Sequence, residues 1–272
     1  MASLAYNPDK IQVRITHDPL EIEAAQAIRY KVFYDEYGAI PSAQMKQAKR
    51  DFDKFDEIAD HLIVLDNDLD NGTERIIGTY RLLRQNIAEQ NGQFYTSDEY
   101  DISSLTTNNK DLLELGRSCV LPDYRSRPIL QKLWEGIAHY VADHNISLMF
   151  GCASLHGTDI NALSKQLAYL YHFHLAPENM RPKALRDRNQ DMNLHAKEDI
   201  DARRVFSSLP PLIKGYIRLG AHIGDGAVID KQFNTTDVCI ILPAGNVKEK
   251  YVKHYERKTN KAIPAGEKIS AS

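Results

Sequence analysis

The sequence of 272 residues lacks the features that would carry a chain into or across a membrane. No apolar run approaches the roughly 20 residues that a spanning helix needs, and the longest runs, such as 237–243, have the length of strands. The first ten residues show no basic segment followed by an apolar core, so we expect no secretory signal. These absences favour a cytoplasmic protein, or one that rests on the inner face of a membrane without crossing it.

An excess of charge of one sign is also missing. The chain carries 34 basic and 37 acidic residues, a net charge of −3, so nothing favours nucleic acid as a partner. A hydrophobic content of 43% and a charged content of 26% are typical of a globular protein.

Patterns of metal binding are absent as well. There is no CxxC or HExxH, and the histidines lack a cysteine or carboxylate partner at ligand spacing, so we expect no metal site. An odd number of cysteines cannot pair completely within one chain, and each lies in an apolar, strand-like run. We expect reduced, buried thiols at Cys119, Cys152 and Cys239.

The apolar periodicity predicts alternating strands and helices. A helix begins at Asp18-Pro19, where aspartate caps and proline suits the first turn, and ends near Gly38. Further helices are expected from Pro128, from 160 to 172 and from 211 to 219, with strands at 11–16, 61–66, 76–83, 113–121, 148–153 and near 227 and 239.

This order of elements predicts a mixed α/β sheet with helices on both faces, in one domain that spans residues 1–272. The segment at about 178–208 is polar and mixed in charge, and we interpret it as an excursion from the core. A basic tail starts at about residue 247.

Four segments taken together resemble the acyl-homoserine-lactone synthases, which are GNAT-fold enzymes that acylate an amine from acyl carrier protein. They are RYKVF at 29–33, the acidic stretch from 51 that contains Asp53 and Asp56, GTYRLL at 78–83 and ELGRSCV at 114–120.

Three downstream segments resemble a narrower group, the L-ornithine Nα-acyltransferases of bacterial ornithine-lipid synthesis. They are FGCASLHGTD at 150–159, YLYHFHLAP at 169–177 and QFNTTD at 232–237. The resemblance runs from about residue 11 to 255 and implies a GNAT-like fold, an acyl carrier protein donor, a 3-hydroxy fatty acyl group and ornithine as acceptor. The alternatives are a homoserine-lactone synthase, an N-acyltransferase for another amino acid, or a lipid- or carrier-binding protein without turnover.

GNAT enzymes usually hold a coenzyme A pyrophosphate in a glycine-containing loop before a helix, and here 125–130 matches that loop without either glycine. Pro128 has no N–H to offer, and Leu130 is bulky where the backbone should approach closely. Arg125 and Arg127 remain as positive charges. This pattern favours the single phosphate of carrier-bound phosphopantetheine, and no cofactor resident in the chain. The alternative is a proline-started helix flanked by solvated arginines.

Acylation of an amine requires a base for the ammonium and an N–H donor for the oxyanion. In the strand that matches the GNAT pattern, the candidate donors are the amides of Cys119 and Val120, and Glu114 is the first choice for the base. Glu114 is equally well interpreted as a structural partner of Arg81 or Arg117. In a regular strand Glu114 and Arg117 point to opposite faces, so a pair between them requires a bulge.

The acceptor would need groups for its carboxylate and its second ammonium. Arg81 or Arg117 are candidates for the carboxylate, Asp53, Asp56 or Asp159 for the side-chain ammonium, and His156 for a place near the acceptor. Tyr169 or Tyr171 are candidates to protonate the leaving thiolate, although tyrosines on an apolar helix face usually belong to a core.

Acyl carrier proteins are acidic, so a basic docking patch is expected despite the negative net charge. The candidates are Arg125, Arg127, Lys132, Arg181, Lys183, Arg186 and Arg188. The tail from 247, with basic and apolar residues interleaved, suggests contact with anionic lipid at the membrane surface.

Overall fold

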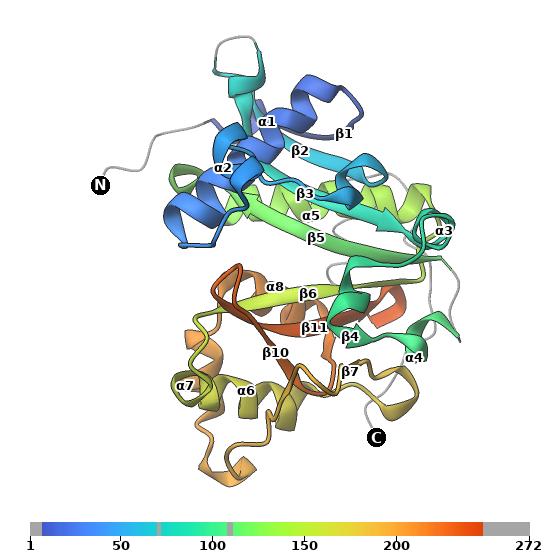
Figure 1. Ribbon diagram of the computed structural model, residues 1–272, viewed down its shortest axis with the longest axis vertical. Coiled ribbons are helices and arrows are strands. Elements are labelled where there is room, and N and C mark those ends of the chain that lie inside the picture. Colours follow the sequence, from blue (N-terminus) through green and yellow to red (C-terminus); the bar gives the residue numbers. More distant parts are fainter. Residues whose placement is uncertain (1–6, 70–71, 108–110, 247–272) are drawn as a thin grey trace.

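The chain forms a mixed sheet of nine strands, as a computed structural model shows (Figure 1). The structure describes residues 7–69, 72–107 and 111–246. Along the sheet the order is β1-β2-β3-β5-β6-β11-β10-β8, with β9 beside β11. The strands are β1 (Ile11–Thr16), β2 (Asp60–Asp66), β3 (Ile76–Arg84), β5 (Leu112–Val120), β6 (Leu148–His156), β8 (Asn189–Gln190), β9 (His222–Ile223), β10 (Ala227–Asp230) and β11 (Thr235–Pro243).

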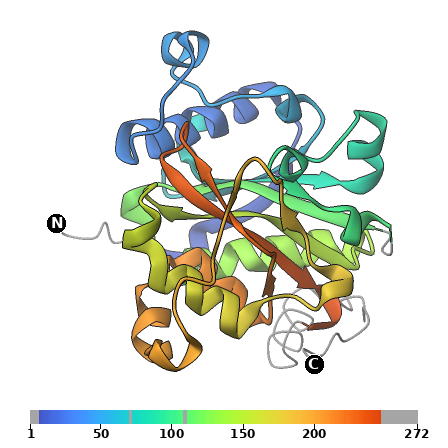
Figure 2. The same ribbon diagram turned by 60° about the horizontal axis from the view of Figure 1, so that its bottom comes forward.

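Helices cover both faces of the sheet, which confirms the predicted architecture (Figure 2). One face packs under α5 (Arg127–Asp143), α6 (Ile160–His174), α7 (Ala202–Ser208) and α8 (Pro211–Leu219). The other face packs under α1 (Pro19–Tyr30) and the segment that follows β3. The shorter elements are α2 (Ala43–Ala48), α3 (Gln85–Gln90), α4 (Ser103–Thr106) and a separate pair of strands, β4 (Tyr100–Asp101) and β7 (Lys183–Ala184).

The first helix ends near Gly38 as predicted, but its last part is not an α-helix. Asp18 caps α1 and Pro19 occupies its first turn, as expected. After Tyr30 the chain continues as a π-helix over Lys31–Glu36, and the last turn is therefore wider than an α-helix allows. This wide turn carries Phe33 and, just beyond it, Tyr37 to the edge of the cavity described below.

The only parallel pair of strands in the sheet, among the residues described, is β5 with β6, and the pairing is short. Three residue pairs join the strands, from Leu112 with Leu148 to Glu114 with Phe150. Both strands continue beyond these pairs without pairing to each other, while β5 stays paired with β3 and β6 with β11. The sheet therefore splits along its middle.

Gly151 lies where the two strands part. Its φ is +155°, and a Cβ atom there would stand 2.2 Å from the carbonyl oxygen of Leu115. Only glycine fits so close an approach, because any side chain would overlap with the backbone of β5.

The other edge of β5, which pairs with β3, contains a bulge. Thr79 pairs with Cys119 and Arg81 with Gly116, so three steps along β5 face two along β3. Within the bulge Arg117 adopts a φ of +51°. The bulge changes the direction of the Arg117 side chain relative to a regular strand.

Residues 178–208 run over the surface but insert apolar side chains into the core. The buried apolar side chains of this segment are Met180, Met192, Ile200 and Val205. Its short strand β8, which is exposed or partly buried, extends the sheet beside β10. The basic tail from 247 lies outside the described residues. No helix in the described part of the chain is long and apolar enough to cross a membrane.

We expect Gly151→Ala to lower the free energy of unfolding by about 2–4 kcal/mol, because the new methyl group would overlap with Leu115. Gly116→Ala is the matched control, since a Cβ there meets nothing within 4 Å, and its effect should stay within about 1 kcal/mol. Urea unfolding of both variants measures the difference. Equal stability of the two would show that β5 and β6 do not part at Gly151.

Candidate active site

The split in the sheet opens into a cavity of about 1180 Å³. Its walls come from both sides of the split and from the start of α5 and α8. The lining residues that matter for the chemistry are Tyr80, Arg81, Glu114, Arg117, Cys119, Val120, Arg125, Leu130, Cys152, His156, Asp230 and Asp237.

The strand geometry distinguishes the two candidate oxyanion donors. Leu121 donates its N–H to the carbonyl oxygen of Ile77 in β3, over 2.9 Å. Backbone groups of successive residues point to opposite sides of a strand, so the N–H of Cys119 also points to β3 and that of Val120 points into the split. The carbonyl of Val120 lies on the same side, where it accepts a hydrogen bond from Nε of Arg125 (2.9 Å). Val120 is therefore the candidate donor, and Cys119 is not.

The start of α5 forms one end of the cavity. Ser126 is the N-cap residue, Pro128 stands in the first turn, and Leu130 faces the cavity. Arg125 lines the cavity too, but its guanidinium is bound by both carboxylate oxygens of Glu36, at 2.5 and 2.6 Å. A phosphate would therefore meet an arginine that is already paired.

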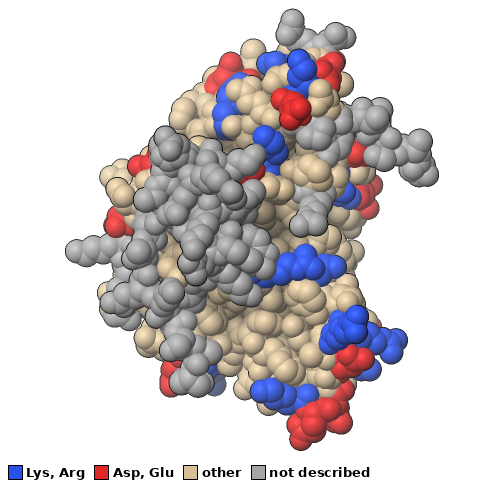
Figure 3. Space-filling view, turned by 180° about the vertical axis from the view of Figure 1, so that it is seen from behind, with Lys and Arg blue, Asp and Glu red and all other residues tan. Residues whose placement is uncertain are grey.

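Several of the basic residues proposed for carrier docking already have partners in the described structure. Lys132 pairs with Glu135 and Arg188 with Glu99, and Arg181 donates to the carbonyl of Ala176. On the face behind Figure 1, Lys and Arg side chains are visible near the top and near the lower edge, in both places beside acidic side chains (Figure 3).

A network of three arginines and three aspartates lies beside the cavity. At its centre Arg29 is fully buried and binds both oxygens of Asp56 at 2.7 Å, with its Nε 2.8 Å from Asp51. Arg81 binds Asp53 at 2.6 Å, and Arg117 bridges Asp53 (2.9 Å) and Asp51 (3.2 Å).

This network corrects two predictions about the acceptor site. Asp53 and Asp56 were candidates for the side-chain ammonium of the acceptor, but both are bound by arginines. Those arginines lower the pKa of both carboxyl groups. Neither residue lines the 1180 Å³ cavity. They serve instead to hold Arg81 and Arg117 at its wall.

Arg117 is the better placed of the two arginines that were candidates for a substrate carboxylate. Its guanidinium lies between the rings of Tyr95 and Phe233, at 4.8 and 4.6 Å from their centroids, and only 12% of its side chain is exposed. Aromatic rings on both sides fix its plane, so that it presents a defined edge to the cavity.

Glu114 is buried and binds the backbone rather than an arginine. Its two oxygens accept the N–H groups of Tyr95 (2.9 Å) and Thr96 (2.6 Å). Burial raises the pKa of the Glu114 carboxyl, and these hydrogen bonds oppose the shift. Glu114 thus holds the segment that supplies Tyr95 to the stack on Arg117, and the predicted pair with Arg81 or Arg117 is not formed.

Three other predicted site residues lie away from the cavity. Tyr169 packs against Phe173 in the core and binds His174, and Tyr171 does not line the cavity either. Asp159 is exposed and caps α6. Both tyrosines follow the apolar face of α6, and Asp159 has a capping role that its place before the helix already suggested.

Two residues that line the cavity are candidates for the remaining roles, a position near the acceptor and protonation of the leaving thiolate. His156 lines the cavity with its ring 4.5 Å from that of Tyr37, and its place near the acceptor stays a prediction. Tyr80 replaces the tyrosines of α6 as the candidate proton donor. Its hydroxyl lies 2.5 Å from that of Tyr216, and burial raises its pKa to about 12, so it stays protonated at neutral pH.

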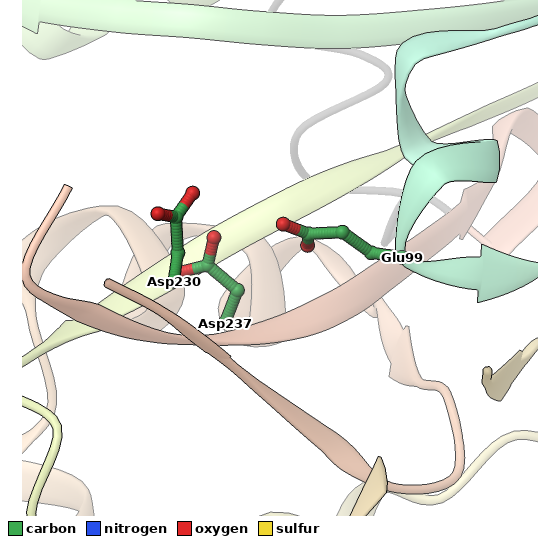
Figure 4. Close-up of side chains that lie close together, drawn as sticks. All are labelled: Glu99, Asp230 and Asp237. Carbon is green, nitrogen blue, oxygen red and sulfur yellow. The ribbon is translucent and has the colours of Figure 1, made fainter. Parts of the chain in front are cut away.

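A cluster of three carboxylates, which we call the acidic cluster, was missed by the sequence analysis (Figure 4). Glu99 lies just before β4, Asp230 ends β10 and Asp237 lies on β11. One oxygen of each lies within 4.8 Å of the others. Asp237 falls inside the QFNTTD segment, which was a usable signal, whereas nothing in the sequence around Glu99 connects it with the other two.

The chain is similar over most of its length to curated acyltransferases. Residues 28–135 match the family model described as an acetyltransferase (GNAT) domain. The L-ornithine N(alpha)-acyltransferase of Rhodobacter capsulatus is 41% identical over 94% of this chain and 98% of its own. The enzyme of the same name from Brucella abortus is 44% identical over 93% of this chain and 91% of its own.

Solved structures with a similar arrangement are more distant. A CoA-dependent acyl-homoserine lactone synthase, BjaI, is 11% identical with a TM-score of 0.49, over 92% of this chain and 88% of its own. The AHL synthase LasI is 11% identical with a TM-score of 0.45, over 96% of this chain and 98% of its own.

We expect Glu114→Gln to lower the free energy of unfolding by about 1–3 kcal/mol, because the new NH₂ group would face one of two backbone N–H donors. Glu89→Gln, on the exposed side of α3, is the control and should change stability little. Thermal unfolding and kcat are measured together. A Glu114→Gln variant of unchanged stability whose kcat falls on the order of a hundredfold would contradict the positioning role and restore Glu114 as the general base.

Proposed function

The chain belongs to the L-ornithine N(alpha)-acyltransferases, and on that basis we propose that it transfers a fatty acyl group from a thioester to the α-amine of L-ornithine. The reaction takes place in the cavity between β5 and β6. The observation that carries this proposal is the N–H of Val120, which the alternation of β5 directs into the split.

The reaction needs few groups from the protein. The neutral α-amine attacks the thioester carbonyl, and the negative charge that develops on the carbonyl oxygen is bound by the N–H of Val120. The carbon–sulfur bond then breaks and the amide forms. The thiolate accepts a proton, and the proton that the nitrogen loses returns to the group that supplied it. Tyr80 suits this last step, because it lines the cavity and carries a proton at neutral pH.

The carboxylate of ornithine is assigned to Arg117. The guanidinium stands at the cavity wall, and its rigid stacking between Tyr95 and Phe233 favours a planar, two-point contact with a carboxylate. Asp51 and Asp53 bind other edges of the same guanidinium and orient it.

For the donor we propose an acyl carrier protein, with a 3-hydroxy fatty acyl group on its phosphopantetheine. The start of α5 supports this. Pro128 removes one of the N–H groups that a pyrophosphate would use, and Leu130 occupies the wall where a glycine would let a phosphate approach. The phosphopantetheine arm arrives with the donor, so the proposal requires no cofactor resident in this chain.

A peripheral position on the inner face of the membrane is also proposed, because an acylated product partitions into lipid at about 0.8 kcal/mol for each buried methylene. The basic residues that would contact lipid start at 247 and lie outside the described residues. This part of the proposal therefore depends on the sequence pattern alone.

Purified protein supplied with a 3-hydroxyacyl carrier protein and L-ornithine should form a product whose mass is that of N-acyl ornithine. Fragmentation in the mass spectrometer should place the acyl group on the α-nitrogen, leaving a free side-chain amine. Lysine, homoserine and S-adenosylmethionine serve as competing acceptors. Preferred acylation of any of these, or no product after prolonged incubation, would contradict the proposed function.

The value of kcat/KM should be at least tenfold higher for an acyl carrier protein than for coenzyme A with the same acyl chain. Replacing Arg125 and Arg127 by alanine should raise KM for the carrier several-fold and leave KM for ornithine unchanged. The increase should shrink as salt rises, since screening already weakens the native contact. The control replaces Lys46 and Lys165, two exposed lysines on other helices. Equal use of the two donors by the wild type would refute the assignment.

A further inference from the structure

We propose that the acidic cluster of Glu99, Asp230 and Asp237 is the subsite for the side-chain ammonium of the acceptor amino acid. The inference rests on the proposed function, and it names the residues that select a diamino acid over a neutral one. Asp56 and Asp159 line neither of the two cavities. Asp53 lines the second cavity described below but is bound by Arg81 and Arg117, so the acceptor's second charge requires another partner.

The cluster brings together three carboxylates from separate elements around one point. An oxygen of each lies within 4.8 Å of the other two, and the three side chains point toward one another (Figure 4). All three are nearly buried, with 2%, 9% and 6% of Glu99, Asp230 and Asp237 exposed. Buried like charges at this spacing repel strongly, so the arrangement is stable only when a proton or a cation lies between them.

Asp237 provides an independent sign that a donor belongs there. Its Oδ1 is buried and makes no hydrogen bond of normal geometry among the described residues, although the side chains of Ser154 and Thr235 lie close enough to the carboxyl to lower its pKa. A buried, unpaired carboxylate oxygen costs free energy that a bound N–H donor would recover. Asp237 also lines the 1180 Å³ cavity, so a ligand there reaches this oxygen directly.

The cluster is continuous with the assigned carboxylate site. A second cavity of about 560 Å³ is lined by Glu99, and the two cavities share Tyr95, Arg117 and Asp230 as walls. An amino acid whose carboxylate binds Arg117 can therefore extend its three side-chain methylenes toward the acidic cluster. Its α-amine then remains on the side of the cavity that Val120 faces.

The charge balance of the cluster differs from that of the neighbouring network. Each of Asp51, Asp53 and Asp56 contacts an arginine within 3.2 Å. Among the described residues, the acidic cluster has one cation within 4.0 Å, Arg188, which lies 3.6 Å from Glu99 and also donates to the carbonyl of Asp98. The three carboxylates therefore have a single ion-pair partner within this distance, and that arginine also binds a backbone carbonyl.

The hydrogen bonds already present favour an ammonium over a metal ion. Oδ1 of Asp230 accepts the N–H groups of Gln232 and Phe233, and Oε2 of Glu99 accepts from the thiol of Cys152 at 3.1 Å. A divalent cation would require most of these oxygens for itself. An ammonium has three N–H donors and needs only one oxygen from each carboxylate.

Ornithine binding should depend on pH. Burial and the nearby Asp237 raise the pKa of Glu99 to about 7, and burial raises that of Asp237 to about 6. The groups that face the cluster from the surrounding elements are Tyr95, Tyr100, Arg117, Cys152, Asp230 and Arg188. Below pH 6 protons occupy the cluster and compete with the ammonium. KM for ornithine should therefore fall as the pH rises from 5.5 to 7.5.

Stability provides a second readout. A carboxyl whose pKa is raised in the folded state stabilises the protein below its unfolded pKa, and this stabilisation is lost as the pH rises through the folded value. The free protein should lose this contribution between about pH 4 and 7.5, and ornithine should restore it. The rise in Tm caused by ornithine should therefore be larger at pH 8 than at pH 5.5.

The test compares ornithine with norvaline, which has the same carbon chain without the side-chain amine. Asp237→Asn and Asp230→Asn should each raise KM for ornithine on the order of 10–100-fold, change kcat/KM for norvaline less than about twofold, and abolish the pH dependence of the Tm shift. Asp187→Asn removes an exposed carboxylate outside the cluster and is the matched control.

Three results would overturn the inference: equal losses for ornithine and norvaline, an ornithine Tm shift that survives both substitutions, or ornithine selectivity that is lost with EDTA and restored by Mg²⁺ or Ca²⁺. Failure of the proposed function can be distinguished from failure of the subsite. If the wild type bound ornithine as described and acylated no amino acid, the subsite would stand without the reaction. If it acylated ornithine and the substitutions had no effect, the reaction would stand without the subsite.

Discussion

The pairing of β5 with β6 stops after three residues, and every part of the site depends on that interruption. Gly151 lets the strands come close before they part, and β3 and β11 hold each strand from its outer side. The split frees the N–H of Val120 from the sheet and leaves room for a substrate in the middle of the protein. A continuous sheet would have used that N–H in its own ladder.

Two groups of acidic residues lie close to this split and differ in their partners. Asp51, Asp53 and Asp56 are matched by three arginines, and this network fixes the wall of the cavity. In the described structure Glu99, Asp230 and Asp237 have one arginine within 4.0 Å, and Oδ1 of Asp237 makes no hydrogen bond of normal geometry. The first group is complete in the free protein, whereas the second is completed by a cation. Residues of the same type thus serve structure in one place and recognition in the other.

The fold could be predicted further than the site. Alternating apolar residues located the long strands, and Asp18-Pro19 marked the start of α1. A bulge was expected only for a pair between Glu114 and Arg117. The strand does bulge between Gly116 and Cys119, but that pair is not formed. Local patterns do not show which charges meet. Asp53 and Asp56 were expected to bind a ligand but bind arginines from α1, β3 and β5, and Tyr169 follows a face that packs inward. The acidic cluster joins positions 99, 230 and 237, whose proximity arises only from the tertiary structure.

A crystal structure of the protein with L-ornithine and a non-hydrolysable analogue of the acyl thioester tests the central claim most directly. The account predicts that the carbonyl oxygen lies within hydrogen-bond distance of the N–H of Val120, with the ornithine α-nitrogen next to the carbonyl carbon and the side-chain nitrogen among Glu99, Asp230 and Asp237. Ornithine bound elsewhere, or a thioester carbonyl that points away from β5, would contradict it.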